Sequence, residues 1–156
     1  MLFSAAAAAG IEITGVPAAQ VEAMQVYGME LGMAFQIMDD ALDYTASAEQ
    51  MGKNAGDDFA DQKITLPTIL AWQDGDAEER AFWRRTLGEA DFTEGDLERA
   101  QALLAAHDAV NRSVAVAHDH AVKAGAALTP FIADERTATL ARALADAALF
   151  AAHRAS

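Results

Sequence analysis

Cysteine is absent from this sequence of 156 residues. The chain therefore has no disulfide framework and no thiolate metal site. Positive charge is also scarce, since 11 lysine and arginine residues stand against 24 aspartate and glutamate residues and give a net charge of −13. This balance argues against nucleic acid as a partner, because the phosphate backbone attracts basic side chains. It also argues against binding to an anionic membrane surface.

Long hydrophobic runs are missing as well, although 53% of the residues are hydrophobic. No stretch approaches the roughly 20 apolar residues that cross a bilayer, so we expect no membrane span. The alanine-rich start lacks the positively charged region of a signal peptide. Together with the absence of cysteine, this pattern favours a cytoplasmic protein. The length is that of one domain, and the apolar content allows a sizeable core.

The alternation of apolar and polar residues that marks strands is absent too, and apolar residues recur at helical spacings. We therefore predict an all-α protein. Gly10 is expected to stop the first helix, Pro130 to interrupt the chain, and Thr93 and Asp134 to cap helices. The predicted helices span residues 2–9, 17–46, 65–72, 77–87, about 94–104, 108–127 and 135–153.

The main candidate site begins with three carboxylates near the end of the second predicted helix, Asp39, Asp40 and Asp43. They fall within about a 100° arc of that helix. Like charges one turn apart destabilise a helix, and the neighbouring residues are apolar, so a positive partner is needed. A hard divalent cation is the simplest such partner. Mg²⁺ suits carboxylates that leave room for substrate phosphates.

Two glycines, Gly28 and Gly32, precede the carboxylates on nearly the same helical face as Gln36. Glycine inside a helix costs about 1 kcal/mol relative to alanine. The two glycines either clear space for a ligand along the helix or allow a second helix to pack closely. Their shared face with the carboxylates slightly favours the ligand channel.

Two lysines flank the loop that follows, Lys53 and Lys63. Glycines and paired aspartates between them indicate a segment rich in turns. Thr65, Leu66 and Pro67 then open a new helix, since proline is tolerated in the first turn. Lysines beside a carboxylate-bound metal make a good diphosphate site, because metal and ammonium groups share the phosphate charge.

The run FQ-x-x-DD-x-x-D, followed by GK-x-x-G-x-D and K-x-TLP, resembles the second aspartate-rich region of trans-polyprenyl diphosphate synthases. Long-chain members, of the octaprenyl and decaprenyl type, are the most similar. The resemblance implies that residues 1–156 form a single partial domain, the C-terminal portion of an orthogonal all-helical bundle of the isoprenoid-synthase type. The N-terminal half, with the first aspartate-rich motif, would be missing.

The same resemblance implies an activity: Mg²⁺-dependent head-to-tail condensation of isopentenyl diphosphate with an allylic diphosphate, for isoprenoids such as quinone side chains. Asp39, Asp40 and Asp43 would bind Mg²⁺, and Lys53 and Lys63 would contact the diphosphate. All five would serve catalysis by stabilising the leaving diphosphate.

Further positions would bind the substrate. Phe35 and Gln36 would face the allylic carbons, and Gly32 would line the path of the isoprenoid. One departure from the family pattern is Gln62, because family members commonly have glycine before the second lysine.

Catalysis in this family uses two facing aspartate-rich helices, so we expect this chain alone to be inactive. The resemblance also implies that the full-length parent is a homodimer. Two alternatives stay open. One is a non-catalytic subunit that binds metal and diphosphate within a hetero-oligomeric synthase. The other is a relative of the terpene cyclases, which the lysine loop ending in TLP disfavours. The length of the product chain is not readable from these residues.

Overall fold

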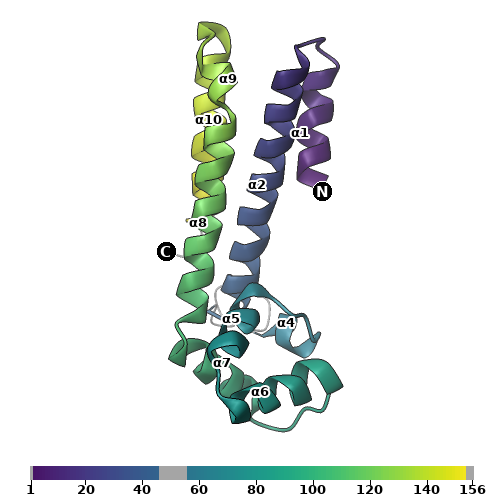
Figure 1. Cartoon of the computed structure of the whole chain (residues 1–156), viewed down its shortest axis with the longest axis vertical. Helices are drawn as coiled ribbons and strands as arrows, with labels where there is room; N and C mark the ends of the chain where they lie inside the picture. The colour runs from purple at the N-terminus through teal and green to yellow at the C-terminus, as the bar shows by residue number, and fades with distance from the viewer. Residues whose placement is uncertain (1, 46–55, 154–156) are drawn as a thin grey trace. The chain divides into compact units, whose positions relative to one another are not determined.

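The computed structural model describes residues 2–45 and 56–153. Every regular element in those ranges is a helix, so the predicted all-α class is confirmed (Figure 1). None of the helices in these two ranges is both long and apolar enough to cross a membrane. The elements are α1 (Leu2–Glu12), α2 (Ala18–Asp43), α4 (Asp57–Ala60), α5 (Leu66–Asp74), α6 (Ala77–Trp83), η1 (Arg84–Gly88), α7 (Asp96–Ala106), α8 (Ala109–Ala127), α9 (Thr129–Ile132) and α10 (Glu135–Ala151).

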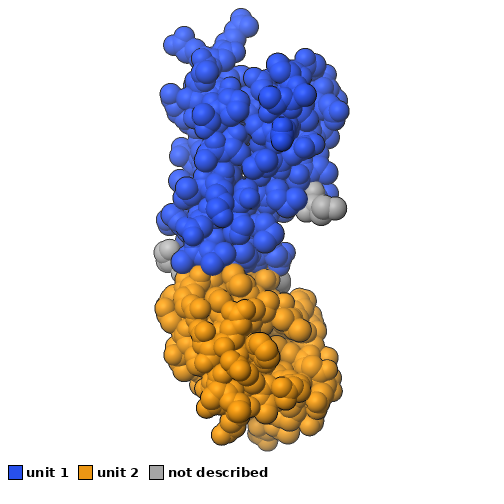
Figure 2. Space-filling model, in the orientation of Figure 1, with its two compact units in different colours: residues 1–38, 115–156 blue, residues 39–114 orange. Residues whose placement is uncertain are grey.

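The chain divides into two compact units, which Figure 2 shows in blue and orange. Unit 1 comprises residues 1–38 and 115–156, and unit 2 comprises residues 39–114. Helices α2 and α8 each contribute residues to both units. The single partial domain expected from the sequence stays a prediction.

Unit 1 is a packing of helices with small side chains at their contacts. Tyr27 on α2 donates a hydrogen bond of 3.0 Å to the carbonyl of Leu144 on α10. Glu30 on α2 lies 2.6 Å from the His120 ring on α8. Because alanine has no side-chain rotamers to order, burying it costs no side-chain conformational entropy. Fully buried alanines of this unit include Ala34, Ala117, Ala121, Ala124 and Ala148.

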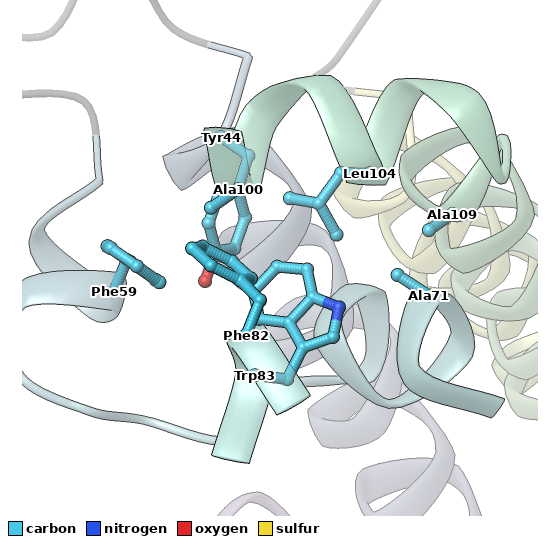
Figure 3. Close-up of a cluster of buried hydrophobic side chains, with 8 residues drawn as sticks. All are labelled: Tyr44, Phe59, Ala71, Phe82, Trp83, Ala100, Leu104 and Ala109. Atoms are coloured by element: carbon cyan, nitrogen blue, oxygen red, sulfur yellow. The ribbon is translucent and has the colours of Figure 1, made fainter. Parts of the chain in front are cut away.

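Unit 2 has an aromatic core (Figure 3). The Phe59 ring stacks on Phe82 with centroids 6.4 Å apart and meets Trp83 edge-on at 6.3 Å. Such aromatic pairs contribute about 0.5–1.5 kcal/mol beyond the area they bury. The cluster thereby joins α4, α6 and α7 to the end of α2. Its members are Tyr44, Phe59, Ala71, Phe82, Trp83, Ala100, Leu104 and Ala109.

Several predicted helix ends are wrong by a few residues. Helix α1 passes through Gly10 and ends at Glu12, and the chain turns at Gly15, whose φ of 72° suits glycine. The interruption expected at Pro130 is confirmed, since α8 ends at Ala127; the sequence analysis missed only the short helix α9, whose first turn holds Pro130 without the loss of a helical hydrogen bond. Asp134 does cap α10, because its carboxylate accepts a hydrogen bond from the Arg136 N–H.

Thr93 is not the cap of α7. That position belongs to Gly95, whose φ is 89°. The Thr93 N–H instead donates to the Asp96 carboxylate at 2.6 Å. The residue that marks the start of α7 in the sequence is therefore Asp96, three residues after Thr93. Asp96 also receives two hydrogen bonds from Arg85, of 2.9 and 2.7 Å. This fork fixes η1 against the start of α7.

The helix predicted over residues 77–87 is in fact two elements, α6 and the π-helical turn η1. Inside that turn, the buried Thr86 hydroxyl donates to the Phe82 carbonyl at 3.0 Å. A threonine that bonds back to the preceding turn bends or loosens a helix. Hydrophobic spacing does not report this effect, because it hardly changes which residues face the core.

Candidate functional site

The three predicted metal ligands lie at the C-terminal end of α2, within unit 2. Asp39 is exposed, whereas Asp40 and Asp43 are half-buried. The last turn of α2 holds no basic residue. A helix C-terminus carries partial negative charge, so carboxylates there are unfavourable and a cation is favoured. The end of α2 is therefore a strongly negative place before any neighbouring residue is considered.

Asp43 is tied to the chain segment that carries α4. Its Oδ2 accepts a hydrogen bond of 3.0 Å from the Asp58 N–H, and its backbone carbonyl accepts one of 3.0 Å from the Gly56 N–H. Gly56 has a φ of 87°, and a Cβ there would lie 2.4 Å from the Leu97 side chain. The positive φ favours glycine, and a larger residue would also have to displace the tip of the Leu97 side chain, so Gly56 suits the approach of this segment to Asp43.

Within the part of the chain that the structure describes, more negative than positive charge acts on Asp43. Burial raises the pKa of its carboxyl, and the carboxylates of Asp58 and Asp57 raise it further. The Asp58 N–H and the Lys63 ammonium act in the opposite direction but do not cancel the rise. Among the described residues, the negative charge around Asp43 is therefore only partly offset, by Lys63.

Lys63 is the cation of this cluster among the described residues. Its Nζ lies 2.6 Å from Asp58 Oδ1 and 3.5 Å from Asp61 Oδ2, and hydrogen bonding to Asp58 raises its pKa. The side chain is 55% exposed, so it is free to change its partner. Its backbone N–H also donates to the Asp58 carbonyl at 2.9 Å.

Gln62 explains the departure from the family pattern noted in the sequence. Its φ is 58°, in the left-handed region that glycine adopts without strain. The turn that presents Lys63 therefore has the backbone for which a glycine is suited. The chain keeps this conformation although it carries a glutamine.

Lys53, the other predicted lysine, lies outside the described residues. The remaining predicted positions are on the part of α2 that belongs to unit 1. Phe35 is half-buried, with its ring centroid 5.7 Å from that of Phe3, and Gln36 is exposed. Their predicted contacts with allylic carbons stay predictions.

The two glycines of α2 face α1. A Cβ on Gly28 would lie 2.4 Å from the Phe3 carbonyl oxygen, which is far inside van der Waals contact. A Cβ on Gly32 would lie 3.3 Å from the Phe3 side chain. Close packing of α1 therefore accounts for Gly28, which the sequence analysis had placed beside a channel. The role of Gly32 as a substrate wall stays a prediction.

No three acidic or histidine residues in the described ranges are arranged to hold a metal ion by themselves. The kind of ligand nevertheless fits Mg²⁺, because the donors are carboxylate oxygens whose negative charge the described residues offset only in part. Mg²⁺ also keeps several waters or takes phosphate oxygens in place of protein ligands. Asp39, Asp40 and Asp43 therefore suit a metal that is shared with a diphosphate.

Sequence reasoning missed Tyr44 and Thr65, which lie against the acidic cluster. Each is only 6% exposed; Thr65 forms a capping box with Thr68 at the start of α5, and Tyr44 Oη has no well-formed hydrogen bond among the described residues. Burial raises the pKa of Tyr44 well above its usual range, with the Asp43, Asp58 and Asp40 carboxylates adding to the rise. Tyr44 directly follows the aspartates in the sequence, and that adjacency was the one signal available.

Comparison with known proteins places these features in a family. A family model described as polyprenyl synthetase matches residues 1–104. Octaprenyl diphosphate synthase of Haemophilus influenzae is 37% identical over 123 residues, which cover 79% of this chain and 37% of that protein. Octaprenyl diphosphate synthase of Escherichia coli is 42% identical over 86 residues, or 55% of this chain and 27% of that one.

Solved structures agree with this assignment. A polyprenyl synthase from Caulobacter crescentus, complexed with calcium and isoprenyl diphosphate, has a TM-score of 0.87 and 43% identity, covering 99% of this chain and 46% of its own. A decaprenyl diphosphate synthase from Rhodobacter capsulatus gives 0.86 and 41%, with coverage of 99% and 46%. The chain spans less than half the length of these relatives. Its sequence and fold show that the chain belongs to the polyprenyl synthetase family.

Proposed function

We propose that this chain is the C-terminal portion of a Mg²⁺-dependent polyprenyl diphosphate synthase, which joins isopentenyl diphosphate to an allylic diphosphate. The observation that carries the proposal is the surplus of carboxylates over cations that the described residues place around Asp43, in a chain of this family. The Caulobacter relative holds a hard cation together with an isoprenyl diphosphate. The same chemistry suits the acidic end of α2.

In this proposal Asp39, Asp40 and Asp43 hold the metal, which supplies Lewis-acid stabilisation of the leaving diphosphate. Lys63 exchanges its bond to Asp58 for one to the diphosphate, which its exposed side chain allows. Asp58 continues to support Asp43 through its N–H, so the carboxylate keeps its orientation during that exchange. Positive charge from Lys63 then meets the developing negative charge of the leaving group.

The substrates, the homodimeric parent and a cytoplasmic location are parts of the same proposal. The relatives named above are chain-elongating synthases, which favours this reading over a terpene cyclase. A non-catalytic partner subunit would bind the same ligands. The two readings differ in whether the complete protein forms new carbon–carbon bonds.

The test is titration calorimetry of the chain with MgCl₂ alone, with inorganic pyrophosphate alone, and with both. We expect weak binding that requires both ligands together, because the carboxylates need the metal and the metal needs phosphate oxygens. Asp39→Asn should abolish the signal, whereas Asp146→Asn, which alters an exposed aspartate of α10, should leave it unchanged. Tight binding of pyrophosphate without metal would refute the site as described.

A further inference from the structure

A cavity of about 300 Å³ lies in unit 2 between α5 and the segment formed by α6 and η1. We call it the α5 cavity. Its volume is at the lower end of the range for small-molecule sites, so it suits a small ligand. The residues that line it are Ile64, Thr68, Ile69, Trp72, Trp83, Arg84, Leu87 and Gly88. None of them belongs to the predicted metal or diphosphate site.

The walls of the α5 cavity leave apolar surface open to solvent. Ile64 is 67% exposed and Trp72 is 44% exposed, and Ile69 is exposed as well. Covering such surface is a main source of favourable free energy when a ligand binds. Trp83, in contrast, is buried in the aromatic core of unit 2 (Figure 3). The cavity therefore combines uncovered apolar side chains with a wall that the core holds in place.

Arg80 fixes the position of Trp72. Its Nε donates a hydrogen bond of 3.0 Å to the Trp72 carbonyl, and its Nη2 donates one of 2.7 Å to the Gln73 carbonyl. The guanidinium carbon also lies 5.2 Å from the centroid of the Trp72 ring, a cation–π contact. A wall that is ordered before the ligand arrives reduces the entropy cost of binding. Because carbonyls are neutral, these hydrogen bonds leave the positive charge of Arg80 beside the cavity.

Arg84 is the charged residue of the cavity lining. The other polar residue there is Thr68, whose hydroxyl donates to the Thr65 carbonyl at 2.8 Å and accepts from the Thr65 N–H at 3.0 Å. Carboxylates are abundant in this chain, yet Arg84 forms no ion pair with the described residues. Other arginines of unit 2 do pair with carboxylates, namely Arg85, Arg99 and Arg112. Arg84 is therefore available to an anionic ligand.

We propose that the α5 cavity binds a small aliphatic carboxylate. Its hydrocarbon chain lies against Ile69, Trp72 and Leu87, and its carboxylate pairs with Arg84. The parallel N–H donors of a guanidinium match the two oxygens of a carboxylate. The mostly aliphatic walls suit a hydrocarbon chain. This site shares no residue with the metal and diphosphate site at the end of α2, so it does not depend on the proposed function.

Intrinsic fluorescence can test this proposal, because the sequence holds two tryptophans and both line the α5 cavity. Titration of the 156-residue chain with octanoate should shift the emission to shorter wavelengths and reach saturation, since the ligand covers the exposed Trp72. Butyrate has the same head group and should bind at least about tenfold more weakly, because it buries fewer CH₂ groups. The absence of a saturable change with octanoate would overturn the proposal.

Variants separate the two parts of the site. Arg84→Gln should weaken octanoate binding about fivefold, the upper effect of an exposed ion pair, and leave octanol binding unchanged. Gly88→Leu should weaken the binding of both ligands, because the new side chain occupies part of the cavity. A Cβ at Gly88 would lie 3.7 Å from Arg84 Cγ, which is ordinary van der Waals contact. Arg142→Gln, on the exposed face of α10 in unit 1, is the matched control and should bind octanoate as the wild type does.

Equal weakening of octanoate binding by Arg84→Gln and Arg142→Gln would show that only the net charge matters, and the proposal would be wrong. It would also be wrong if Gly88→Leu kept the thermal midpoint of the wild type and bound octanoate as tightly. If Gly88→Leu lowers the midpoint, the comparison of Arg84→Gln with Arg142→Gln decides by itself. Neither Mg²⁺ nor pyrophosphate is present, so every one of these outcomes is separate from the fate of the proposed function.

Discussion

Asp43 is the residue at which stability and function conflict most directly. Its carboxyl is partly desolvated and sits near the carboxylates of Asp57 and Asp58, which raises its pKa. An asparagine would keep an oxygen that accepts the Asp58 N–H but would remove the charge. A single substitution can therefore test the effect of the Asp43 charge on stability and its effect on ligand binding separately.

We predict that Asp43→Asn makes the free chain more stable while destroying ligand binding. After allowance for solvent screening of a partly exposed group, the gain in unfolding free energy should be a few tenths to about 1 kcal/mol. Urea unfolding measures the first effect and calorimetry with Mg²⁺ and pyrophosphate the second. Retained binding would show that Asp43 is not a ligand of the metal.

Gly28 gives a second prediction at this scale. An alanine there would place its Cβ against the backbone of Phe3 and Ser4, at 2.4–2.8 Å, and backbone cannot move aside as a side-chain tip can. Gly28→Ala should therefore destabilise the chain by about 1–3 kcal/mol. Gly10→Ala is the control, because a Cβ at Gly10 meets nothing within 4 Å, and alanine in α1 should be neutral or stabilising. Equal thermal midpoints for the two variants would contradict the packing of α1 on α2.

Among the elements, α7 depends on a single buried carboxylate. Arg85 and the Thr93 N–H hold the pKa of Asp96 at about 2, below its ordinary value of 3.8. Because the folded state has the lower pKa, Asp96 contributes its full stabilisation above about pH 4. That contribution is lost as the pH falls from about 4 to 2.

We therefore expect wild type and Asp96→Asn to differ most in urea midpoint near neutral pH and to converge as the pH approaches 2. The sign follows because protonated Asp96 resembles asparagine in charge. Glu98→Gln on the exposed face of α7 is the control and should follow the wild type closely. A gap that stays constant from pH 7 to pH 2.5 would mean that the charge of Asp96 is not what fixes η1 to α7.

Periodicity in the sequence predicted which segments are helices, but chemistry at single positions decided where the helices begin and end. Helices α2, α8 and α10 are long enough for apolar residues to recur over several turns, which makes the helical spacing clear. The short elements are different. Gly95, not Thr93, is the cap of α7, while the Thr93 N–H donates to Asp96, and the Thr86 hydroxyl of η1 donates to the Phe82 carbonyl of α6.

The candidate site was predicted in the same uneven way. The three aspartates and Lys63 could be predicted because they are part of the motif FQ-x-x-DD-x-x-D … K-x-TLP. The support of Asp43 by the Asp58 N–H was not visible, since backbone donors leave no signal in side-chain spacing. Tyr44 and Thr65 were missed because an aromatic residue and a hydroxyl residue beside a helix end are ordinary in composition, and only burial makes them unusual.

At the scale of the whole molecule, the length of the chain bears on whether it can be active by itself. The chain covers 37% of the octaprenyl diphosphate synthase of Haemophilus influenzae and 46% of the Caulobacter polyprenyl synthase. We predict that the 156-residue chain, supplied with isopentenyl diphosphate, an allylic diphosphate and Mg²⁺, makes no elongated prenyl product. Chromatography of the reaction products measures this, with a full-length synthase of the family as positive control. Any elongated product would show that one aspartate-rich helix is sufficient for the reaction.

Unit 1 is assembled from the two ends of the chain, and this has a consequence for how the protein is made. The hydrogen bond from Tyr27 to Leu144 joins residues 117 positions apart. A ribosome adds roughly 5–20 residues per second, so α10 is synthesised on the order of ten seconds after α2. Unit 2, which is continuous from residue 39 to 114, leaves the ribosome complete during that delay. The hydrogen bond between Tyr27 and Leu144 can therefore form only after unit 2 has been synthesised, which makes the pairing of α2 with α10 a late step of folding.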